Sequence, residues 1–236
     1  MSKQIALVTG ANKGVGQAVA DQLARLGMIV YLGSRDETRG RAAAEAMQDA
    51  GDVRPLTLDV TDEASVRAAL DTIEAESGRL DVLVNNAGIA PEPGDAVHAS
   101  SENIALCFET NLHGPARLTQ MAVPLLSKSR AGRVVNVASE AGSLTLLSGD
   151  FGYPMPYAYC ASKAGLNAAT VLFALALKKD GIKVNAVSPG LVNTGLSHHM
   201  GTRTPADAAG IIVKFATIDD DGPTGGFFNE KGSLPW

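Results

Sequence analysis

Short apolar runs alternate with longer stretches of helical periodicity along the whole chain. Each run is hydrophobic at nearly every position rather than at every second one, which is typical of strands buried on both faces of a parallel sheet. The pattern predicts seven such strands, of which the last is weak. They span Ile5–Thr9, Met28–Leu32, Val53–Leu58, Val82–Val84, Arg133–Ala138, Ile182–Val187 and Gly226–Phe228.

The stretches between the strands repeat their apolar residues every three or four positions, which predicts helices. Asp62 and Thr204 are residue types that cap helix N-termini, and Pro205 suits a first helical position. The predicted helices span Gly16–Leu26, Glu37–Ala50, Asp62–Ser77, roughly Ser101–Ser127, Tyr157–Lys179 and Pro205–Ala216. Joined by right-handed crossovers, these elements give an α/β fold of the Rossmann type: an open, doubly wound parallel sheet with helices on both faces.

We expect one domain over residues 1–236, because α/β folds of this length are often undivided and no linker rich in Pro, Gly and Ser interrupts the chain. Ligands of such sheets bind outside the carboxyl ends of the strands. The loops at 90–95 and 148–156 are therefore expected to border a site.

Composition narrows the class of partner. Hydrophobic residues make up 45% of the chain and charged residues 19%, and a net charge of −5 without a basic cluster offers nothing to a nucleic-acid backbone. The sequence shows no signal peptide and no apolar run near the length that a bilayer requires. We expect a cytoplasmic protein that binds small molecules, with no nucleic acid and no membrane partner.

Cysteine and histidine usage predicts neither disulfides nor a metal site. Cys107 and Cys160 are too few for a disulfide framework, so two free thiols are expected. The four histidines, with His198 and His199 adjacent, lack the spacing or the cysteine neighbours of a metal site.

A glycine-rich segment, Thr9–Gly16, follows the first strand and leads into the first helix, with glycines at 10, 14 and 16. Glycines let a backbone turn sharply and approach a pyrophosphate, whose charge is stabilised by free N–H groups and by the helix dipole. The spacing differs from the usual Gly-x-Gly-x-x-Gly, so the match lies in the mechanism. The alternative is a glycine-rich turn without a ligand.

The end of the second strand bears on which dinucleotide binds. An acidic residue there accepts hydrogen bonds from a ribose 2′-hydroxyl, but this chain has Ser34 and Arg35, with Lys13 in the glycine-rich segment. Two cations favour a 2′-phosphate and hence NADP(H). The adjacent Asp36 and Glu37 weaken the argument, and Arg35 merely solvated beside Asp36 is the alternative.

Tyr159 and Lys163 lie four residues apart in a predicted helix, so both side chains should leave the same face. A nearby ammonium favours a phenolate and lowers a phenol's pKa, which suits the phenol to exchange a proton with a substrate oxygen. A chance pair on a solvated face is the alternative. Tyr153 and Tyr157 have no lysine four residues later, and Cys160 is interpreted as a packing residue.

Six motifs in this order resemble a classical short-chain dehydrogenase/reductase over about residues 4 to 236. They are Thr9-Gly10-x-x-x-Gly14-x-Gly16, Asn85-Asn86-Ala87-Gly88, Asn111, Ser139, Tyr159-x-x-x-Lys163 and Pro189-Gly190. The segment Gly10–Gly14 and the C-terminal residues from Gly226 to Trp236 are similar to the carbonyl-reductase-like branch, which generally prefers NADPH.

The resemblance implies a role for each catalytic residue. Tyr159 would protonate the substrate oxygen and Ser139 would hold that oxygen. Lys163 would bias Tyr159 and bind the nicotinamide ribose, while Asn111 would help to hold a relay water. The alternatives are that Ser139 only caps a turn and that Asn111 only bonds to the backbone inside its helix. The implied cofactor-binding residues, with those that the residue pattern itself suggests, are Gly10, Asn12, Lys13, Gly14, Val15, Gly16, Ser34, Arg35, Asp59, Val60, Asn85, Ala87, Gly88, Tyr159, Lys163, Pro189, Gly190, Val192 and Thr194.

Two segments depart from the common family pattern. Nineteen residues separate Ser139 from Tyr159, which predicts an added apolar flap with Leu144–Leu147 and Phe151–Pro156, and about ten separate Thr194 from Pro205, which predicts that the usual substrate lid is nearly absent. We expect an open pocket that admits bulky apolar ketones or aldehydes. The expected substrate-contacting residues are Ser139, Phe151, Tyr153, Tyr159, Leu191 and Leu196.

Oligomeric state stays open at this point. The stretch Ala168–Leu177 is apolar nearly all round, which fits a helix buried by a partner subunit or a deeply buried helix of a monomer. A long insertion before the tyrosine is associated with monomers in the resembling branch. A homodimer or homotetramer is possible, and a monomer is not excluded.

The function that we expect is an NADPH-dependent carbonyl reductase that interconverts ketones or aldehydes with alcohols. A 3-oxoacyl-thioester reductase is one rival, although the acidic surface and missing lid argue against docking of an acidic carrier. An NAD-dependent alcohol dehydrogenase is a second. A dinucleotide-sensing regulator without turnover is a third, but the tyrosine and lysine that such proteins usually lose are present.

Overall fold

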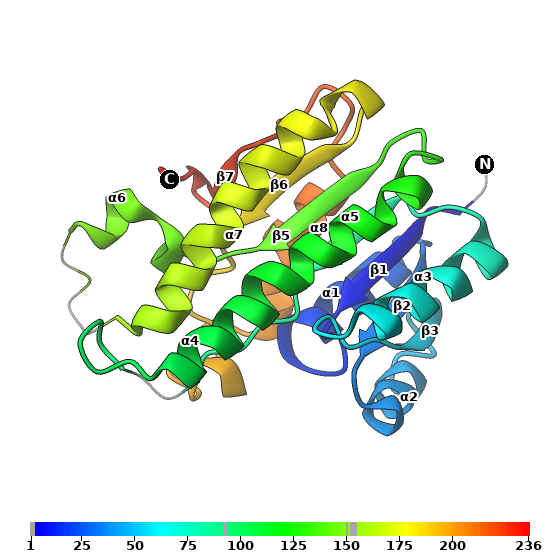
Figure 1. Ribbon diagram of the computed structural model, residues 1–236. Helices are drawn as coiled ribbons and strands as arrows, with labels where there is room; N and C mark the ends of the chain where they lie inside the picture. Colours follow the sequence, from blue (N-terminus) through cyan, green and yellow to red (C-terminus); the bar gives the residue numbers. More distant parts are fainter. Residues whose placement is uncertain (1–2, 92–93, 150, 152–154) are drawn as a thin grey trace.

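A single sheet runs through the molecule with helices on both faces (Figure 1). The computed structural model describes residues 3–91, 94–149, 151 and 155–236. The strand order is β3-β2-β1-β4-β5-β6-β7-β8, so the chain reverses its direction of travel across the sheet between β1 and β4. This is the topological switch point at which open α/β sheets bind their ligands.

The predicted strands are present, and their parallel pairing is confirmed from β3 across to β7. Their bounds are β1 Ile5–Thr9, β2 Ile29–Ser34, β3 Asp52–Thr57, β4 Val82–Asn85, β5 Arg133–Val137, β6 Lys183–Val187 and β7 Phe227–Asn229. The described residues add an eighth strand, β8 (Gly232–Ser233), which pairs antiparallel with β7. Two residues carry too little hydrophobic pattern for a strand to be predicted from sequence.

The helices follow the predicted order. Their bounds are α1 Gly14–Arg25, α2 Glu37–Glu45, α3 Glu63–Ser77, α4 Ser101–Phe108, α5 Gly114–Leu126, α6 Leu144–Leu147, α7 Tyr157–Ala176 and α8 Pro205–Ala216. The prediction that the second helix reaches Ala50 was wrong: after Glu45 the chain continues in tight turns, with Ala50 N–H bonded to Met47 O at 2.8 Å. Met47 and Ala50 are still buried against the core, so the apolar period outlasts the helix.

The predicted long helix Ser101–Ser127 is divided by a turn of π-helix, Glu109–His113, in which Gly114 N–H bonds to Glu109 O. Pro115 follows at the start of α5 and has no N–H to give to Asn111 O, so a regular α-helical ladder loses a bond here. Close packing adds a second constraint, because a Cβ on Gly114 would lie 2.9 Å from Val60 Cγ2.

Two apolar layers enclose the sheet. Residues of α1, α2 and α8 pack on one face and residues of α3, α5 and α7 on the other. In Figure 1, α5 and α7 lie in front of the sheet and α8 lies behind it. Among the described residues, no helix has the length and apolarity needed to cross a bilayer.

The outer face of α7 settles one alternative about the apolar stretch Ala168–Leu177. Leu172 and Leu175 are 65% and 67% exposed, so this helix is not buried all round within one chain. The interpretation as a deeply buried monomer helix was therefore wrong. Burial by a partner subunit stays a prediction.

Candidate active site

The glycine-rich segment after β1 has the conformation that its composition predicts. Gly10 and Gly14 adopt φ of 62° and 59°, a left-handed region that favours glycine. Gly16 has no room for a side chain, because an added Cβ would lie 2.6 Å from Gly10 O and 2.4 Å from Asn86 Nδ2. The loop thus folds onto itself and onto the end of β4.

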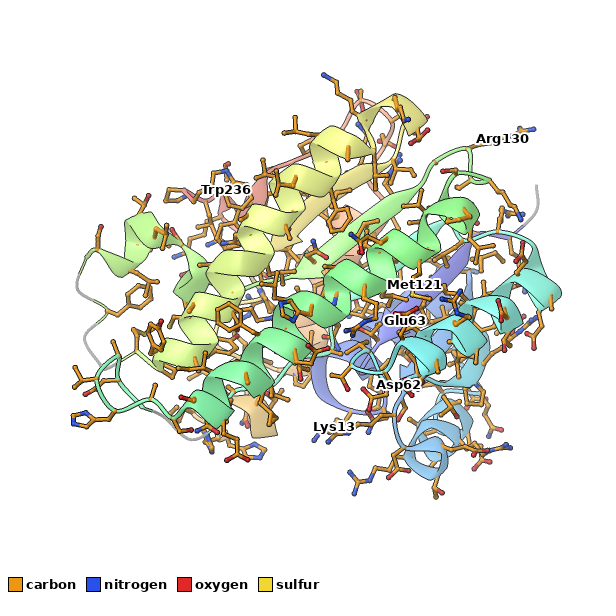
Figure 2. The ribbon with its side chains drawn as sticks, viewed as in Figure 1. Lys13, Asp62, Glu63, Met121, Arg130 and Trp236 are labelled. Carbon is orange, nitrogen blue, oxygen red and sulfur yellow. The ribbon has the colours of Figure 1, made fainter. Side chains whose placement is uncertain are left out.

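The N-terminus of α1 at Gly14 is open to an anion. Its cap residue, Lys13, makes no side-chain capping bond, and the first turn contains no acidic residue. Lys13 itself is exposed, and its side chain projects at the same end of the sheet as Asp62 (Figure 2). Uncapped N–H groups, a positive helix end and glycines at 10, 14 and 16 fit the pyrophosphate of a dinucleotide.

The segment after β6 lies against this loop. A Cβ added at Gly14 would lie 3.5 Å from Thr194 Cγ2, so the two loops are in contact range. Gly190 has a φ of 76°, and Arg203 holds the turn by donating from Nη1 to Pro189 O at 2.9 Å. Val192 is buried beneath. The structure therefore brings Thr194 to the glycine-rich loop, and its contact with a cofactor stays a prediction.

The end of β2 shows why the neighbouring acids do not neutralise Arg35. Asp36 accepts a bond from Arg39 N–H as the N-cap of α2 and also pairs with the Arg39 side chain at 3.2 Å. Glu37 pairs with Arg41 at 2.6 Å. Arg35 is exposed and forms no ion pair within the described part of the chain.

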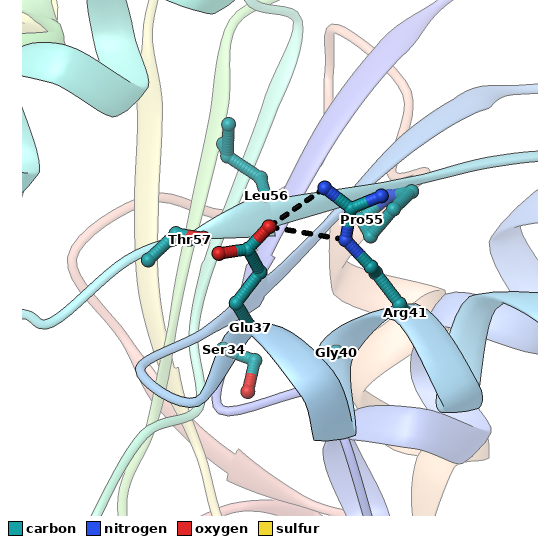
Figure 3. Close-up of a pocket in the computed structure, with 7 residues that line it drawn as sticks. All are labelled: Ser34, Glu37, Gly40, Arg41, Pro55, Leu56 and Thr57. Carbon is teal, nitrogen blue, oxygen red and sulfur yellow. Dashed lines mark hydrogen bonds and ion pairs between the residues drawn. The ribbon is translucent and has the colours of Figure 1, made fainter.

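A cavity of about 240 Å³ lies between α2 and β3 and borders Ser34 (Figure 3). Its lining residues are Ser34, Glu37, Gly40, Arg41, Pro55, Leu56 and Thr57. The Glu37–Arg41 ion pair lies across it, as the dashed lines in Figure 3 show. A smaller cavity of about 130 Å³ contacts Tyr159, so the larger one is not the one beside the phenol.

Asp59 and Val60 follow β3. Asp59 Oδ1 accepts bonds from the Thr61 backbone N–H and hydroxyl at 2.9 and 2.7 Å, which fixes the turn into α3. Val60 is buried against Gly114, and its carbonyl oxygen accepts a bond from Arg117 Nη1 at 2.8 Å. Both positions are thus rigid at the carboxyl edge of the sheet.

Tyr159 and Lys163 lie on the same face of α7, as predicted. Lys163 Nζ is 5.8 Å from the centre of the Tyr159 ring and donates to Val137 O, at the end of β5, at 2.8 Å. The lysine is 4% exposed, and burial lowers its pKa to about 8. At pH 7 its ammonium form therefore still dominates.

Asn111, in the π turn, lies against the same lysine. An added Cβ on Gly88 would be 3.3 Å from Asn111 Oδ1 and 3.6 Å from Lys163 Nζ, so these three residues meet. Asn111 is held in place by three bonds: Oδ1 accepts from Ile89 N–H at 2.8 Å, and Nδ2 donates to Ile89 O at 2.9 Å and to Ser162 Oγ at 3.0 Å.

Ser139 follows β5 and begins a 3-10 helix, Glu140–Gly142. Its Oγ accepts a bond from Ala141 N–H at 3.2 Å, so the hydroxyl hydrogen can be donated to another group. Glu140, the next residue, bonds through its N–H to Ser188 Oγ at 3.2 Å. The loop is thus anchored to the end of β6.

Comparison with known proteins adds a family to this geometry. Residues 4–204 match the model of the short chain dehydrogenases. The chain belongs to the short chain dehydrogenase family. It is therefore an oxidoreductase of a family that uses a nicotinamide dinucleotide.

Individual relatives of this short chain dehydrogenase match nearly their whole length. The (−)-isopiperitenone reductase of Mentha piperita is 33% identical over 309 aligned positions, covering 98% of each chain. The structure of salutaridine reductase from Papaver somniferum has a TM-score of 0.84 at 31% identity, covering 97% of this chain and 100% of that one. The NADPH-bound carbonyl reductase from chicken fatty liver has a TM-score of 0.89 at 25% identity, covering 100% of both.

The Asn85 side chain turns into the core of this short chain dehydrogenase. It is 2% exposed and donates to Thr119 Oγ1 at 3.1 Å and to Asn136 Oδ1 at 2.8 Å. That Asn85 lines a cofactor stays a prediction, and such a contact would have to come from its backbone. A polar residue at the end of a strand suggests a side chain at the exposed carboxyl edge of the sheet. Here the side chain instead joins a buried hydrogen-bond network with Thr119 and Asn136.

Thr9 and Asn86 were missed as functional residues. The Thr9 hydroxyl accepts bonds from Asn86 N–H at 3.0 Å and Ala87 N–H at 2.9 Å, and Asn86 Nδ2 donates to Thr9 O at 2.8 Å. These bonds join the ends of β1 and β4 at the switch point. Both residues stand inside the quoted motifs, but the bonds connect positions 77 or 78 residues apart and become visible only once β1 pairs with β4.

The substrate side of the short chain dehydrogenase is less enclosed. The cavity beside Tyr159 is lined by Pro91, Gly94, His98, Ala99, Ser100, Asn103, Pro156 and Ala158. Leu191 and Leu196 do not line it and are 51% and 44% exposed. Phe151 is half-buried, and Tyr153 lies outside the described residues. The roles of these four residues toward a substrate stay predictions.

The loop that follows β6 is compact in place of a long lid. Val192 and Arg203 form a short parallel bridge, and Asn193 N–H bonds to Arg203 O at 2.9 Å. Gly201 lies so close to this bridge that an added Cβ would be 2.3 Å from Val192 C. The prediction of a nearly absent lid is confirmed in the length and pinched shape of this loop.

Both cysteines are free thiols, as expected. Burial raises the pKa of Cys107, and it raises the pKa of Cys160 to about 11. Both stay protonated at neutral pH, which fits the interpretation of Cys160 as a packing residue. Within the described residues, no group of three His, Cys, Asp or Glu side chains is placed to hold a metal ion.

Proposed function

We propose that this short chain dehydrogenase is an NADPH-dependent carbonyl reductase that converts ketones or aldehydes to alcohols. The observation that carries the proposal is the meeting of Lys163 and Asn111 at Gly88, with Tyr159 on the same helix face and the dinucleotide cradle next to it. The relatives with the names isopiperitenone reductase, salutaridine reductase and carbonyl reductase support the reductive direction.

In the proposed reaction, Tyr159 donates its phenolic proton to the carbonyl oxygen while Ser139 holds that oxygen by a hydrogen bond. When bound, NADPH supplies the hydride for the carbonyl carbon. The Lys163 ammonium stabilises the negative charge that develops on Tyr159, and its burial strengthens that effect because little water screens it. Asn111 is bonded to the backbone of Ile89, and Lys163 Nζ is held by its own bond to Val137 O.

The preference for NADPH over NADH rests on Arg35 and Lys13. Both are exposed cations at the carboxyl edge of the sheet, and the acids beside Arg35 are engaged by Arg39 and Arg41. A 2′-phosphate there gains charge-assisted hydrogen bonds from Arg35 and Lys13. The ion pairs of Asp36 with Arg39 and of Glu37 with Arg41 weaken the objection that these two acids raised against the sequence argument.

The proposed substrates are bulky apolar carbonyl compounds. The loop after β6 is short and leaves Leu191, Leu196 and Met200 exposed, so an apolar substrate can cover them and remove apolar surface from water. The aligned relative from Mentha piperita spans 309 positions against the 236 residues here, so it contains segments that this chain lacks. We therefore expect broad acceptance rather than strict selection.

The test is oxidation of NADPH and of NADH against a panel of apolar and polar carbonyl compounds, with the parent protein, Tyr159→Phe and Tyr157→Phe. Tyr157 is exposed two residues earlier on α7 and is the matched control. We expect Tyr159→Phe to lower kcat by about 1000-fold and Tyr157→Phe to change it less than about twofold. Near-parental turnover by Tyr159→Phe contradicts the assignment of the proton donor.

A further inference from the structure

We propose that Asn167 is a positioning residue that sets the placement of Ser139 relative to Tyr159 and Lys163. The proposal rests on the proposed carbonyl reductase function, because it assigns a residue to the reaction of that site. Asn167 lies four residues after Lys163 on α7, on the same face, and is 3% exposed.

The side chain of Asn167 bonds to the backbone of the Ser139 loop. Its Nδ2 donates to Gly142 O at 3.0 Å, and Gly142 is the last residue of the 3-10 helix that Ser139 begins. Within that helix, Gly142 N–H bonds to Ser139 O at 2.8 Å and Ala141 N–H bonds to Ser139 Oγ at 3.2 Å. The bond from Asn167 therefore fixes the position of Gly142. Because Gly142 and Ser139 belong to one tight turn, the same bond also fixes the position of the Ser139 hydroxyl.

The loop and the helix also touch directly at Gly142. A Cβ at this position would lie 2.7 Å from Lys163 C, 2.8 Å from Lys163 O and 2.9 Å from Lys163 Cβ. The two backbones are packed without space between them. A small displacement of Gly142 therefore moves Ser139 relative to the catalytic lysine. Asn167 holds this contact closed from one helical turn further along.

Only one side of the Asn167 amide has a hydrogen-bond partner among the described residues. Its Oδ1 is buried and finds no hydrogen-bond partner among the described residues, which is unfavourable compared with an apolar side chain of similar size. The atom that acts on the Ser139 loop is Nδ2, which donates to Gly142 O.

Other anchors hold the loop from other directions. Glu140 is bonded by Ser188 through its backbone N–H and by Asn229 Nδ2 through its carboxylate, at 3.2 and 2.9 Å. Those bonds fix the loop to the ends of β6 and β7. Asn167 ties it to the helix that carries Tyr159 and Lys163, which is the relation that the reaction needs.

The test is a double-mutant cycle of Asn167→Ala and Ser139→Ala, with Thr170→Val as the matched control. Thr170 is fully buried on the same helix one turn later and bonds to Asn136, not to the Ser139 loop. Measured quantities are kcat and KM for a reduced carbonyl compound, the NADPH dissociation constant by fluorescence, the melting temperature, and amide hydrogen exchange of residues 139–143 without ligand.

We expect Asn167→Ala to lower kcat by about 10- to 100-fold while the NADPH dissociation constant stays within about twofold. In the Ser139→Ala background the same change should have almost no further effect, because the residue acts through Ser139. Hydrogen exchange of residues 139–143 should accelerate. Thr170→Val should lower the melting temperature without lowering kcat. Should Asn167→Ala fold poorly, Asn167→Leu keeps the buried volume and removes the bond to Gly142 O. It should also lower kcat, with no further loss in the Ser139→Ala background.

Independent, multiplicative losses from the two alanine substitutions overturn the proposal, as does an unchanged kcat in Asn167→Ala. In either case, loss of turnover in Tyr159→Phe shows that the proposed function still stands. If the parent reduces no carbonyl compound, or Tyr159→Phe retains its turnover, the proposed function fails and this inference fails with it.

Discussion

The side that we propose for the dinucleotide and the side that we propose for the substrate are held together by different kinds of contact. On the dinucleotide side, backbones meet without side chains between them: Gly16 approaches Gly10 O, and Gly10 approaches Ala87. On the substrate side, exposed side chains such as Leu191 and Leu196 stand on a short loop. Gly16 on the first side leaves no space for a methyl group, whereas the second side exposes large apolar side chains on a loop whose base is held by the Val192–Arg203 bridge.

This difference indicates where selectivity resides. A cradle built from glycine backbones binds one ligand shape, which suits a cofactor that never changes. A rim of exposed apolar side chains selects by hydrophobic contact, which discriminates poorly between ligands of similar size. The protein should therefore be strict toward its dinucleotide and tolerant toward its carbonyl substrate.

The largest effect is expected at Gly16. Gly16→Ala places a Cβ against Gly10 O and Asn86, so the cradle must move, and the NADPH dissociation constant should rise by at least about 100-fold with a lower melting temperature. Gly210→Ala is the control: it lies in α8 with nothing within 4 Å of an added Cβ and should be neutral or stabilising. Fluorescence titration and thermal melts measure both. Unchanged NADPH binding by Gly16→Ala contradicts the rigid cradle.

The next effect concerns the free energy of unfolding, which the burial of the charged Lys163 lowers. Its folded pKa of about 8 lies below the ordinary 10.5, so the folded state binds protons more weakly than the unfolded state. Below pH 8 the full penalty applies, on the order of 3 kcal/mol, and it fades as the pH rises from about 8 to 10.5.

Lys163→Met should therefore be more stable than the parent at pH 7, and that advantage should shrink toward pH 10.5 while kcat is lost. Denaturant unfolding at several pH values measures the difference in the free energy of unfolding. If the difference in the free energy of unfolding between the two proteins stays constant from pH 7 to 10, Lys163 does not have a lowered pKa in the folded state.

Cofactor choice gives a smaller effect. Arg35→Ser should raise the KM for NADPH by about 10- to 30-fold and leave the KM for NADH almost unchanged, because only the 2′-phosphate loses a partner. Arg130→Ser is a control, since this arginine projects far from Lys13 at the opposite end of the molecule (Figure 2). Equal losses for both dinucleotides exclude a role of Arg35 toward the phosphate.

The smallest effect is expected on the substrate rim. Leu196→Ser should raise the KM for a bulky apolar ketone by roughly three- to tenfold and leave kcat and the KM for NADPH unchanged, because it removes apolar contact without touching the reacting groups. Leu26→Ser, an exposed leucine at the end of α1, is the matched control. A large drop in kcat with Leu196→Ser contradicts the picture of a passive rim.

Much of the fold was predictable because strand burial and turn chemistry are local. The buried runs of β1 and β4 to β6 and the capping residues Asp62 and Thr204 appear directly in the sequence. The turn after Glu45 and the π turn at Glu109–His113 were not predicted, because the first preserves the apolar period and the second depends on Pro115 and on close packing at Gly114.

The site was predictable in its chemistry and less so in its supports. The four-residue spacing predicted that Tyr159 and Lys163 meet, and they do. The inward turn of Asn85 and the bond from Asn167 to Gly142 were not predictable, because each depends on the partner that the tertiary fold brings beside it. A polar residue in an apolar stretch signals such a network but does not name its partner.

The π turn at Glu109–His113 limits which insertions and deletions this enzyme can accept. One residue more or fewer in a helix rotates everything beyond it by about 100°. Deleting a residue such as Thr110 would restore a regular helix, but then either Asn111 leaves the lysine or the fully buried Leu118 leaves the core. Exposed side chains such as Leu196 can be exchanged without moving the backbone, whereas this helix has a fixed length of chain between its chemistry and its packing.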